Sequence, residues 1–76
     1  MLTSEQIRAA RALLRWDQKD LAKAAGISVE TVKRLEKNPG PVSAYHATVE
    51  AITKALEAAG AEFTNDDGPG VRVKKR

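Results

Sequence analysis

The chain contains no cysteine, and its 76 residues include only one histidine and one residue each of Trp, Tyr and Phe. Without cysteine, neither a disulfide framework nor a cysteine-based zinc site can brace the fold. The single histidine, His46, has no second imidazole with which to bind a metal. No carboxylate lies at a spacing from a nucleophile or base that would indicate a catalytic site. We therefore expect no metal, no cofactor and no enzyme activity.

Long apolar runs are also missing. The stretch with fewest charges, residues 40–49, contains Pro, Ser, Thr and His, so no membrane span is predicted. The first five residues lack the basic segment of a secretory signal. These features favour a cytoplasmic protein.

Charge is unevenly distributed along the chain. The net charge is +3, and the excess lies in residues 1–37, where eight Lys and Arg residues face five Asp and Glu residues. A basic first half favours a surface that faces phosphate groups.

The first helix is predicted over Ser4–Leu14. Thr3 and Gln6 have the spacing of a capping box, in which each residue bonds the backbone N–H of the other. Ile7 and Ala10 then begin an apolar stripe at helical spacing.

A second, short helix is predicted over Gln18–Ala25. Asp17 is expected to cap its first turn, with Trp16 and Leu21 packed together as a hydrophobic staple. Gly26 is suited to the left-handed conformation that ends many helices.

A third helix is expected from Ser28, as its cap, to Lys37, with Val32 and Leu35 facing inward. Residues 38–41, Asn-Pro-Gly-Pro, end it. A fourth helix is expected to open at Ser43 and to close at Gly60, with its apolar face formed by Val49, Ile52 and Leu56.

The last residues change character. Residues 61–64 and 71–74 alternate in polarity around a turn-rich segment, which predicts a β-hairpin. An isolated two-stranded hairpin is marginal in water, so it must pack on the helices or pair with another subunit. The basic end formed by Lys74, Lys75 and Arg76 is expected to fray. We thus predict an all-α, compact bundle of four to five helices over residues 1–60, with a hairpin or strand extension, a possible dimerisation element, over 61–76.

Two short capped helices joined by Gly26, Ile27 and Ser28 have the features of a helix-turn-helix. Residues 18–28, QKDLAKAAGIS, together with Val32 and Leu35-Glu36, resemble the Cro/phage-repressor type of this motif, often called the XRE family. The resemblance implies a compact helical domain that binds operator DNA, usually as a dimer, to regulate transcription.

The resemblance also implies roles for single residues. It places Gln18 against phosphate, puts the base-reading positions at Val29, Glu30 and Arg34 with Lys33 adjacent, and pairs Arg11 with Glu36.

Side-chain chemistry gives similar assignments for the third helix. Arg34 can bind guanine through two hydrogen bonds, and Glu30 can accept one from cytosine. Lys33, Lys37 and Asn38 are candidate phosphate contacts. In each case the alternative is an ordinary solvated side chain or, for Glu30 and Asn38, a helix-end role.

This sequence departs from the family pattern at two positions. Arg15 stands where members often have Gly, and Val29 stands where they often have a polar residue. Val29 can contact a thymine methyl group but cannot hydrogen-bond a base. The usual fifth helix is not evident; either one long helix or the hairpin replaces it.

The leading hypothesis is a regulator that binds double-stranded DNA, as a homodimer formed through the fourth helix and the C-terminal strand. One alternative is an antitoxin or anti-activator of the same fold that acts mainly through a protein partner. Another is a pure protein-interaction module, which the cations of the third helix disfavour.

Overall fold

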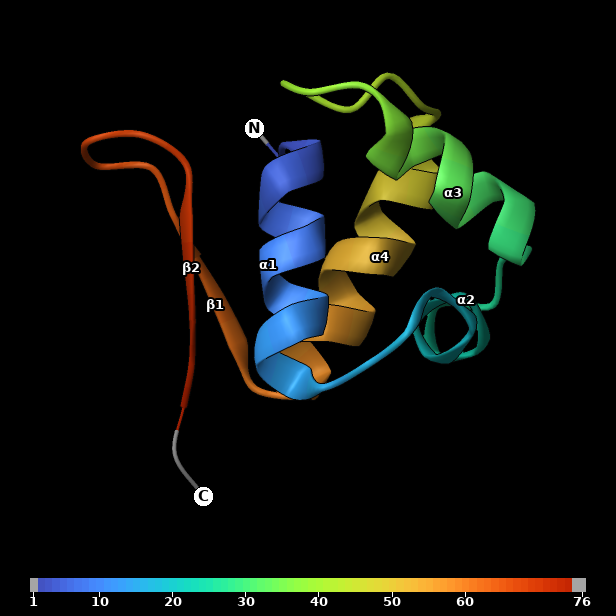
Figure 1. Ribbon diagram of the computed structural model, residues 1–76, viewed down its shortest axis with the longest axis horizontal. Coiled ribbons are helices and arrows are strands. Elements are labelled where there is room, and N and C mark those ends of the chain that lie inside the picture. Colours follow the sequence, from blue (N-terminus) through green and yellow to red (C-terminus); the bar gives the residue numbers. More distant parts are fainter. Residues whose placement is uncertain (1, 75–76) are drawn as a thin grey trace.

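The computed structural model describes residues 2–74. Four helices are followed by one antiparallel hairpin: α1 (Ser4–Leu14), α2 (Gln18–Ala25), α3 (Val29–Lys37), α4 (His46–Ala58), β1 (Ala61–Thr64) and β2 (Gly70–Val73). In Figure 1 the hairpin stands on one side of α1, whereas α2 and α3 lie on the far side. The predicted helical bundle with a C-terminal hairpin is thus observed, with four helices in the described part of the chain. The fraying expected for Lys75 and Arg76 concerns residues outside it.

The predicted start of α1 is confirmed in atomic detail. Gln6 N donates to Thr3 Oγ1 at 3.1 Å, and Thr3 N donates to Gln6 Oε1 at 2.9 Å. These reciprocal bonds satisfy two N–H groups that a helix end otherwise leaves without partners. Both side chains are buried, so this cap is also part of the interior.

The fourth helix, α4, starts later in the chain than the sequence predicts. The helix begins at His46, with Tyr45 as its cap residue, and not at Ser43. The preceding segment is held against the N-terminal residues, because Val42 N donates to Leu2 O at 3.1 Å and Pro41 forms a β-bridge with Thr3. These tertiary bonds keep the chain extended there and delay the helix.

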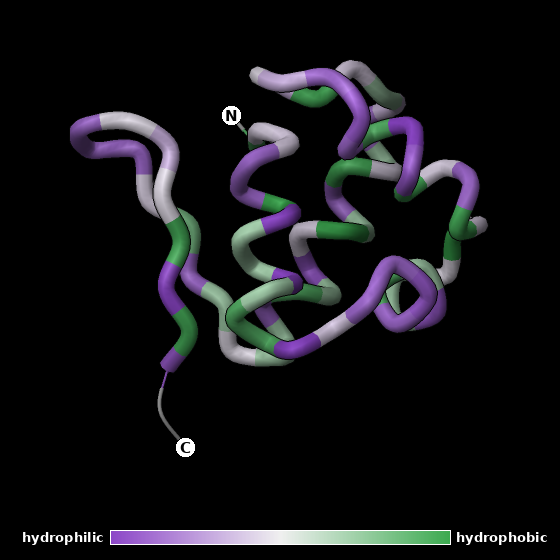
Figure 2. The backbone as a smooth tube through the Cα atoms, in the orientation of Figure 1, coloured by the Kyte–Doolittle hydropathy of each residue, from purple (hydrophilic) through white to green (hydrophobic). Residues whose placement is uncertain are grey.

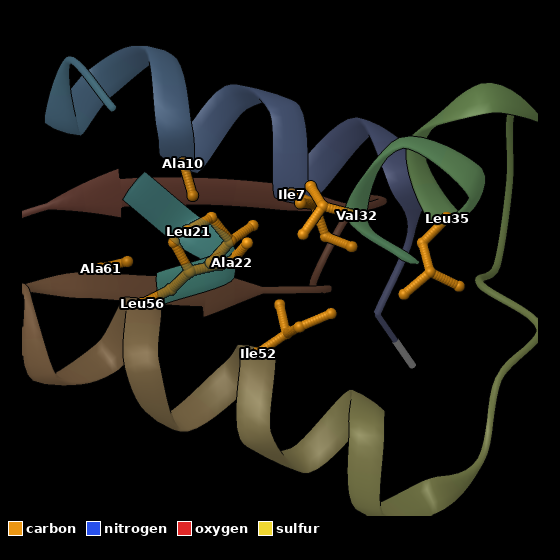
Figure 3. Close-up of a cluster of buried hydrophobic side chains, with 9 residues drawn as sticks. All are labelled: Ile7, Ala10, Leu21, Ala22, Val32, Leu35, Ile52, Leu56 and Ala61. Atoms are coloured by element: carbon orange, nitrogen blue, oxygen red, sulfur yellow. The ribbon is translucent and has the colours of Figure 1, made fainter. Parts of the chain in front are cut away.

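The core lies where four helices and β1 meet. Its buried side chains point toward one another in Figure 3: Ile7, Ala10, Leu21, Ala22, Val32, Leu35, Ile52, Leu56 and Ala61. Removal of this apolar surface from water is the main force that holds the helices together. The core therefore fixes α3 relative to α1 and α2.

The predicted hairpin is confirmed, and it packs on the helices of its own chain. Ala61 pairs with Val73 and Thr64 with Gly70, and the turn between the strands is hydrophilic (Figure 2). Val71 and Val73 lie partly buried against the core.

Gln6 joins the hairpin to α1. Its Nε2 donates to Gly70 O at 2.9 Å and to Thr64 O at 3.2 Å, so one side-chain amide reaches both strands. Gln6 is only 2 % exposed. The packing and these bonds overcome the weakness of an isolated hairpin within a single chain.

Candidate nucleic-acid interface

The turn between α2 and α3 has the geometry that the motif requires. Gly26 ends α2 in the left-handed conformation, with φ 71°. Ile27 N donates to Ala22 O at 3.0 Å and Gly26 N to Lys23 O at 3.3 Å, which is the Schellman arrangement of a helix end. Ser28 Oγ then accepts from Thr31 N at 3.2 Å and starts α3. Two helices are thereby joined within three residues.

The other end of this pair is fixed by Asp17. Its Oδ1 accepts from Asp20 N at 2.8 Å, while Asp17 N donates to Asp20 Oδ2 at 3.0 Å. The expected cap at Asp17 is therefore confirmed, and Asp20 completes it as a capping box. Trp16, just before the cap, lies partly buried against the core.

The third helix, α3, presents two chemically different faces. Val32, Leu35 and Glu36 are buried, whereas the opposite face leaves its charged side chains in solvent: Glu30, Lys33, Arg34 and Lys37. Val29 is partly buried and packs against the core, which leaves only part of its side chain accessible. Asn38 follows the helix in an extended conformation and is exposed.

A shallow depression of about 630 Å³ lies between α1 and α3, and we call it the cationic basin. The residues that line it come from three helices: Arg8, Arg11, Gln18, Lys33, Arg34, Glu36 and Lys37. Five of them are cations and one is a carboxylate. Glu30, Val29 and Asn38 lie outside the basin.

The single carboxylate of the basin, Glu36, is neutralised by Arg11 of α1. Arg11 Nε donates to Glu36 Oε2 and Arg11 Nη2 donates to Glu36 Oε1, both at 2.7 Å. The hydrogen bond to Glu36 raises the pKa of Arg11, with a smaller opposing effect of burial. This confirms that the predicted pair is a contact between α1 and the end of α3, with Glu36 95 % buried.

Two further residues bind Glu36. Gln18 Nε2 donates to Glu36 Oε1 at 3.1 Å, and Arg8 Nη1 donates to the backbone oxygen of Glu36 at 2.6 Å. Glu36 thus fixes the amide of Gln18 at the edge of the basin. Arg8 binds one of the carbonyl groups that the C-terminal end of a helix leaves without a partner.

The cations of α3 itself are not neutralised by a carboxylate in this way. Within residues 2–74, the ion pairs do not include Lys33, Arg34 or Lys37. Because the carboxylate of Glu36 is already compensated by Arg11, the basin and its rim have an excess of positive charge. Such a surface attracts a polyanion.

Comparison with protein families gives a match to a helix-turn-helix family model over residues 7–58, which run from α1 to the end of α4. The match covers more than half of the chain. The protein belongs to the Cro/C1-type helix-turn-helix family, the XRE family. This is a family of DNA-binding regulators. A search of curated proteins finds no match.

The hairpin lies outside the region shared with the family, which ends at residue 58. Within that region, one family departure has a clear structural consequence. Arg15 ends α1 in the left-handed conformation, with φ 59° and ψ 38°. The Gly that family members often have at this position adopts such angles without strain. Arg15 therefore adopts backbone angles that a glycine would adopt without strain.

Sequence reasoning missed Arg8. Its side chain both lines the basin and binds the end of α3. A signal was available, because Arg8 lies three residues before Arg11 and so on the same helix face. The geometry adds Arg8 to the candidate phosphate-facing residues.

None of the four helices within residues 2–74 has the length and apolarity that crossing a membrane requires.

Proposed function

We propose that this protein is a sequence-specific regulator of transcription that inserts α3 into the major groove of double-stranded DNA. The main observation behind this proposal is the exposed face of α3. Its three cations, Lys33, Arg34 and Lys37, form no ion pairs within residues 2–74. The opposite face is anchored in the core, and an α-helix fits the ~12 Å width of the major groove. Membership of a family of DNA-binding regulators supports the same proposal.

The side chains divide into two groups by what they can recognise. Lys33 and Lys37 carry flexible point charges that suit phosphate oxygens, and Gln18 and Asn38 offer amide donors at either side. Arg8 joins this phosphate-binding group through its place in the basin. These contacts orient the protein on DNA and carry no sequence information themselves.

Base recognition is assigned to the exposed side chains on the helix itself. Arg34 can bind guanine O6 and N7 together, which discriminates against a wrong base by ~1–3 kcal/mol. Glu30, in the first turn, can accept from cytosine N4. The accessible part of Val29 is left for an apolar contact with a thymine methyl group.

We further propose that two copies bind one two-fold symmetric DNA site, because a nine-residue helix reads only a few base pairs. Half-site centres then lie one turn of DNA apart, ~34–36 Å. The longest extent of one copy, 28 Å, fits one protomer per half-site. α4 and the C-terminal strand β2 form the proposed dimer surface. Titration calorimetry on a selected site tests this, since two protomers per duplex are expected and one per duplex contradicts it.

Selection of binding sites from random duplexes, followed by measurement of affinity against salt, tests the main proposal. Arg34→Ala should relax preference at one base pair, whereas Lys33→Ala should weaken all sequences alike and reduce the log–log salt slope by ~0.9. Lys23→Ala is the matched control, because Lys23 is an exposed cation of α2 that does not line the basin. If the unmodified protein enriches no DNA sequence and its affinity does not depend on salt, the proposal is refuted.

A further inference from the structure

The hairpin leaves the outer edge of β2 without a partner strand. Lys74 N donates to Gly60 O at 3.0 Å, which fixes the phase of the hydrogen bonds between β1 and β2. In an antiparallel pair, successive residues of a strand point their backbone groups to opposite sides. The N–H and C=O groups of Val71 and Val73 therefore point away from β1, and no hydrogen bond within residues 2–74 engages them. An edge of this kind can accept a further strand.

An apolar groove lies beside this edge, where the hairpin stands next to α1 (Figure 1). The groove has a volume of about 420 Å³. One wall is formed by Ala9, Ala12 and Leu13 of α1, which are all exposed, and the other by Pro69 and Val71. Leu13 is 53 % exposed, the highest value for a large aliphatic side chain in the described part of the chain. The core thus leaves this stripe of α1 uncovered, and a strand added to β2 would cover it.

The groove is separate from the cationic basin, and the two share no lining residue. Arg8 and Arg11 line the basin, whereas Ala9 and Leu13 line the groove from a different face of α1. Gln6 connects the two walls of the groove, because its amide on α1 binds both strands of the hairpin. The site is therefore formed before a ligand arrives, which lowers the entropic cost of binding.

The charges on the outer face of the hairpin favour an acidic ligand. Arg72 and Lys74 share the carboxylate of Glu62, with N–O distances of 2.7 and 3.0 Å, so two cations face one anion. Their side chains remain 77 % and 70 % exposed. Glu5 also lines the groove, but its carboxylate already accepts from Gly40 N. A strand beside β2 would place alternate side chains next to Arg72, where carboxylates complete the pairing.

We propose that the open edge of β2 binds an extended segment of a partner protein in which apolar residues alternate with Asp or Glu. The backbone of this segment bonds the outward groups of Val71 and Val73. Its apolar side chains cover Ala12 and Leu13, and its carboxylates lie beside Arg72. In strand addition, backbone bonds supply affinity and alternate side chains supply specificity. This inference goes beyond the proposed function and does not depend on DNA binding.

A second copy of this chain is a poorer occupant of the same edge. If two β2 strands pair antiparallel about a two-fold axis, with each Val71 opposite the other copy's Val73, the two Arg72 side chains stand directly opposite each other. Like charges at such positions are destabilising. Because β2 is also part of the proposed dimer surface, the acidic segment and a second copy compete for it, and the charge favours the segment.

Peptide titration of the full chain, followed by NMR, tests the proposal. The probe is a short synthetic peptide that alternates Glu and Val, and a peptide that alternates Lys and Val is its matched control. The Glu peptide should shift the amide resonances of Val71 and Val73 to saturation and slow their exchange with solvent, because these N–H groups gain an acceptor. The amide resonances of α3 should stay in place. The Lys peptide should bind about fivefold more weakly or less.

Three variants test separate parts of the contact with the Glu peptide. Val73→Pro removes one outward N–H and leaves the bonds between β1 and β2 in place, so binding should weaken about twofold to tenfold. Leu13→Ser removes an exposed apolar contact and should weaken binding at least about threefold. Arg72→Gln should weaken it about twofold to fivefold. Lys54→Gln is the matched control for Arg72, because Lys54 is an equally exposed cation that pairs with a carboxylate on α4.

The outcomes decide the proposal. Saturable shifts at Val71 and Val73, with weaker binding by Leu13→Ser and Arg72→Gln, support it even if Val73→Pro does not fold. Failure of the Glu peptide to bind, or equal binding of the Lys peptide, overturns it. Slow exchange of the two amides in the free protein that increases with protein concentration would show that a second copy occupies the edge, and this also overturns it. The measurements contain no DNA, so they stand or fall separately from the proposed function.

Discussion

Arg11 and Glu36 are joined by two parallel hydrogen bonds of 2.7 Å, from Nε to Oε2 and from Nη2 to Oε1. The side chain of Glu36 is 4 % exposed and that of Arg11 is 17 % exposed. The pair connects α1 to the last turn of α3 and so sets the angle at which α3 faces solvent. Paired planar groups of this kind combine geometric specificity with charge-assisted bonding.

The first prediction concerns the loss of one partner. Arg11→Met leaves a buried carboxylate without its cation, and removal of one member of a buried pair is strongly destabilising. Since Arg11 retains some contact with water, we expect the free energy of unfolding to fall by about 2–3 kcal/mol. Urea denaturation followed by circular dichroism measures the change.

The double variant Arg11→Met, Glu36→Leu is the control for this prediction. It removes both charges, so most of the lost stability should return. A double variant no more stable than Arg11→Met would show that the pair contributes by shape and not by charge.

The second prediction concerns Gln6, whose amide binds Thr64 O and Gly70 O while its oxygen accepts from Thr3 N. Gln6→Leu preserves bulk but removes all three hydrogen bonds, of which the one to Thr3 N is buried and the two to the hairpin are partly buried. We expect a loss of about 2–3 kcal/mol, with hairpin amides exchanging with solvent sooner than those of α2 and α3. Hydrogen exchange followed by NMR measures both effects.

Arg72→Gln is the matched control for Gln6. Arg72 pairs with Glu62 on the exposed face of the same hairpin, and exposed ion pairs contribute little to stability. Equal acceleration of exchange in the Gln6 and Arg72 variants would contradict an anchoring role for Gln6.

The third prediction concerns the two left-handed helix ends, Arg15 with φ 59° and Gly26 with φ 71°. A side chain in this region costs ~1–2 kcal/mol, part of which the greater freedom of an unfolded glycine offsets. Arg15→Gly should therefore raise the free energy of unfolding by up to about 1 kcal/mol. The reverse change, Gly26→Ala, should lower it by about 1 kcal/mol.

A Cβ at Gly26 would meet no atom within 4 Å, so the cost of Gly26→Ala is conformational and not steric. Thermal unfolding of both variants tests the pair. A lower melting temperature for Arg15→Gly would mean that the Arg15 side chain stabilises α1 by more than its backbone strain costs.

The fourth prediction concerns acid stability. Glu5 Oε1 accepts from Gly40 N at 3.0 Å, and this hydrogen bond lowers the pKa of Glu5 below its ordinary value of 4.5. Hydrogen bonding to Arg72 likewise lowers the pKa of Glu62. A carboxyl group with a depressed folded pKa stabilises the protein above its unfolded pKa, and this contribution disappears as the pH falls through the folded value.

Stability should therefore be constant near neutral pH and fall as the pH drops below the usual carboxyl pKa of 4.5. Glu5→Gln and Glu62→Gln together should flatten this decline in urea titrations at several pH values. An unchanged decline in the double variant would exclude these two groups as its cause.

Most helix boundaries and the turn between α2 and α3 could be predicted from sequence alone, because their causes are local. Thr3, Asp17 and Ser28 cap the turn that follows each of them, and Gly26 ends α2 through its own backbone freedom. The hairpin is similarly local, since its strands flank a turn of polar residues, glycine and proline. The arrangement of cations and inward apolar residues on α3 follows from helical periodicity in the same way.

Tertiary structure decided what depends on residues far apart in the chain. The predicted start of α4 at Ser43 was wrong, because the hydrogen bond from Val42 N to Leu2 O keeps the preceding segment extended and the helix begins at His46. The roles of Gln6 toward the hairpin and of Arg8 toward α3 span separations of 64 and 28 residues. No pattern of local spacing encodes such contacts, because they exist only once the core has brought the helices together. The sequence by itself determined that α3 has a cationic face, and the fold decided which neighbouring side chains, Arg8 among them, stand beside it.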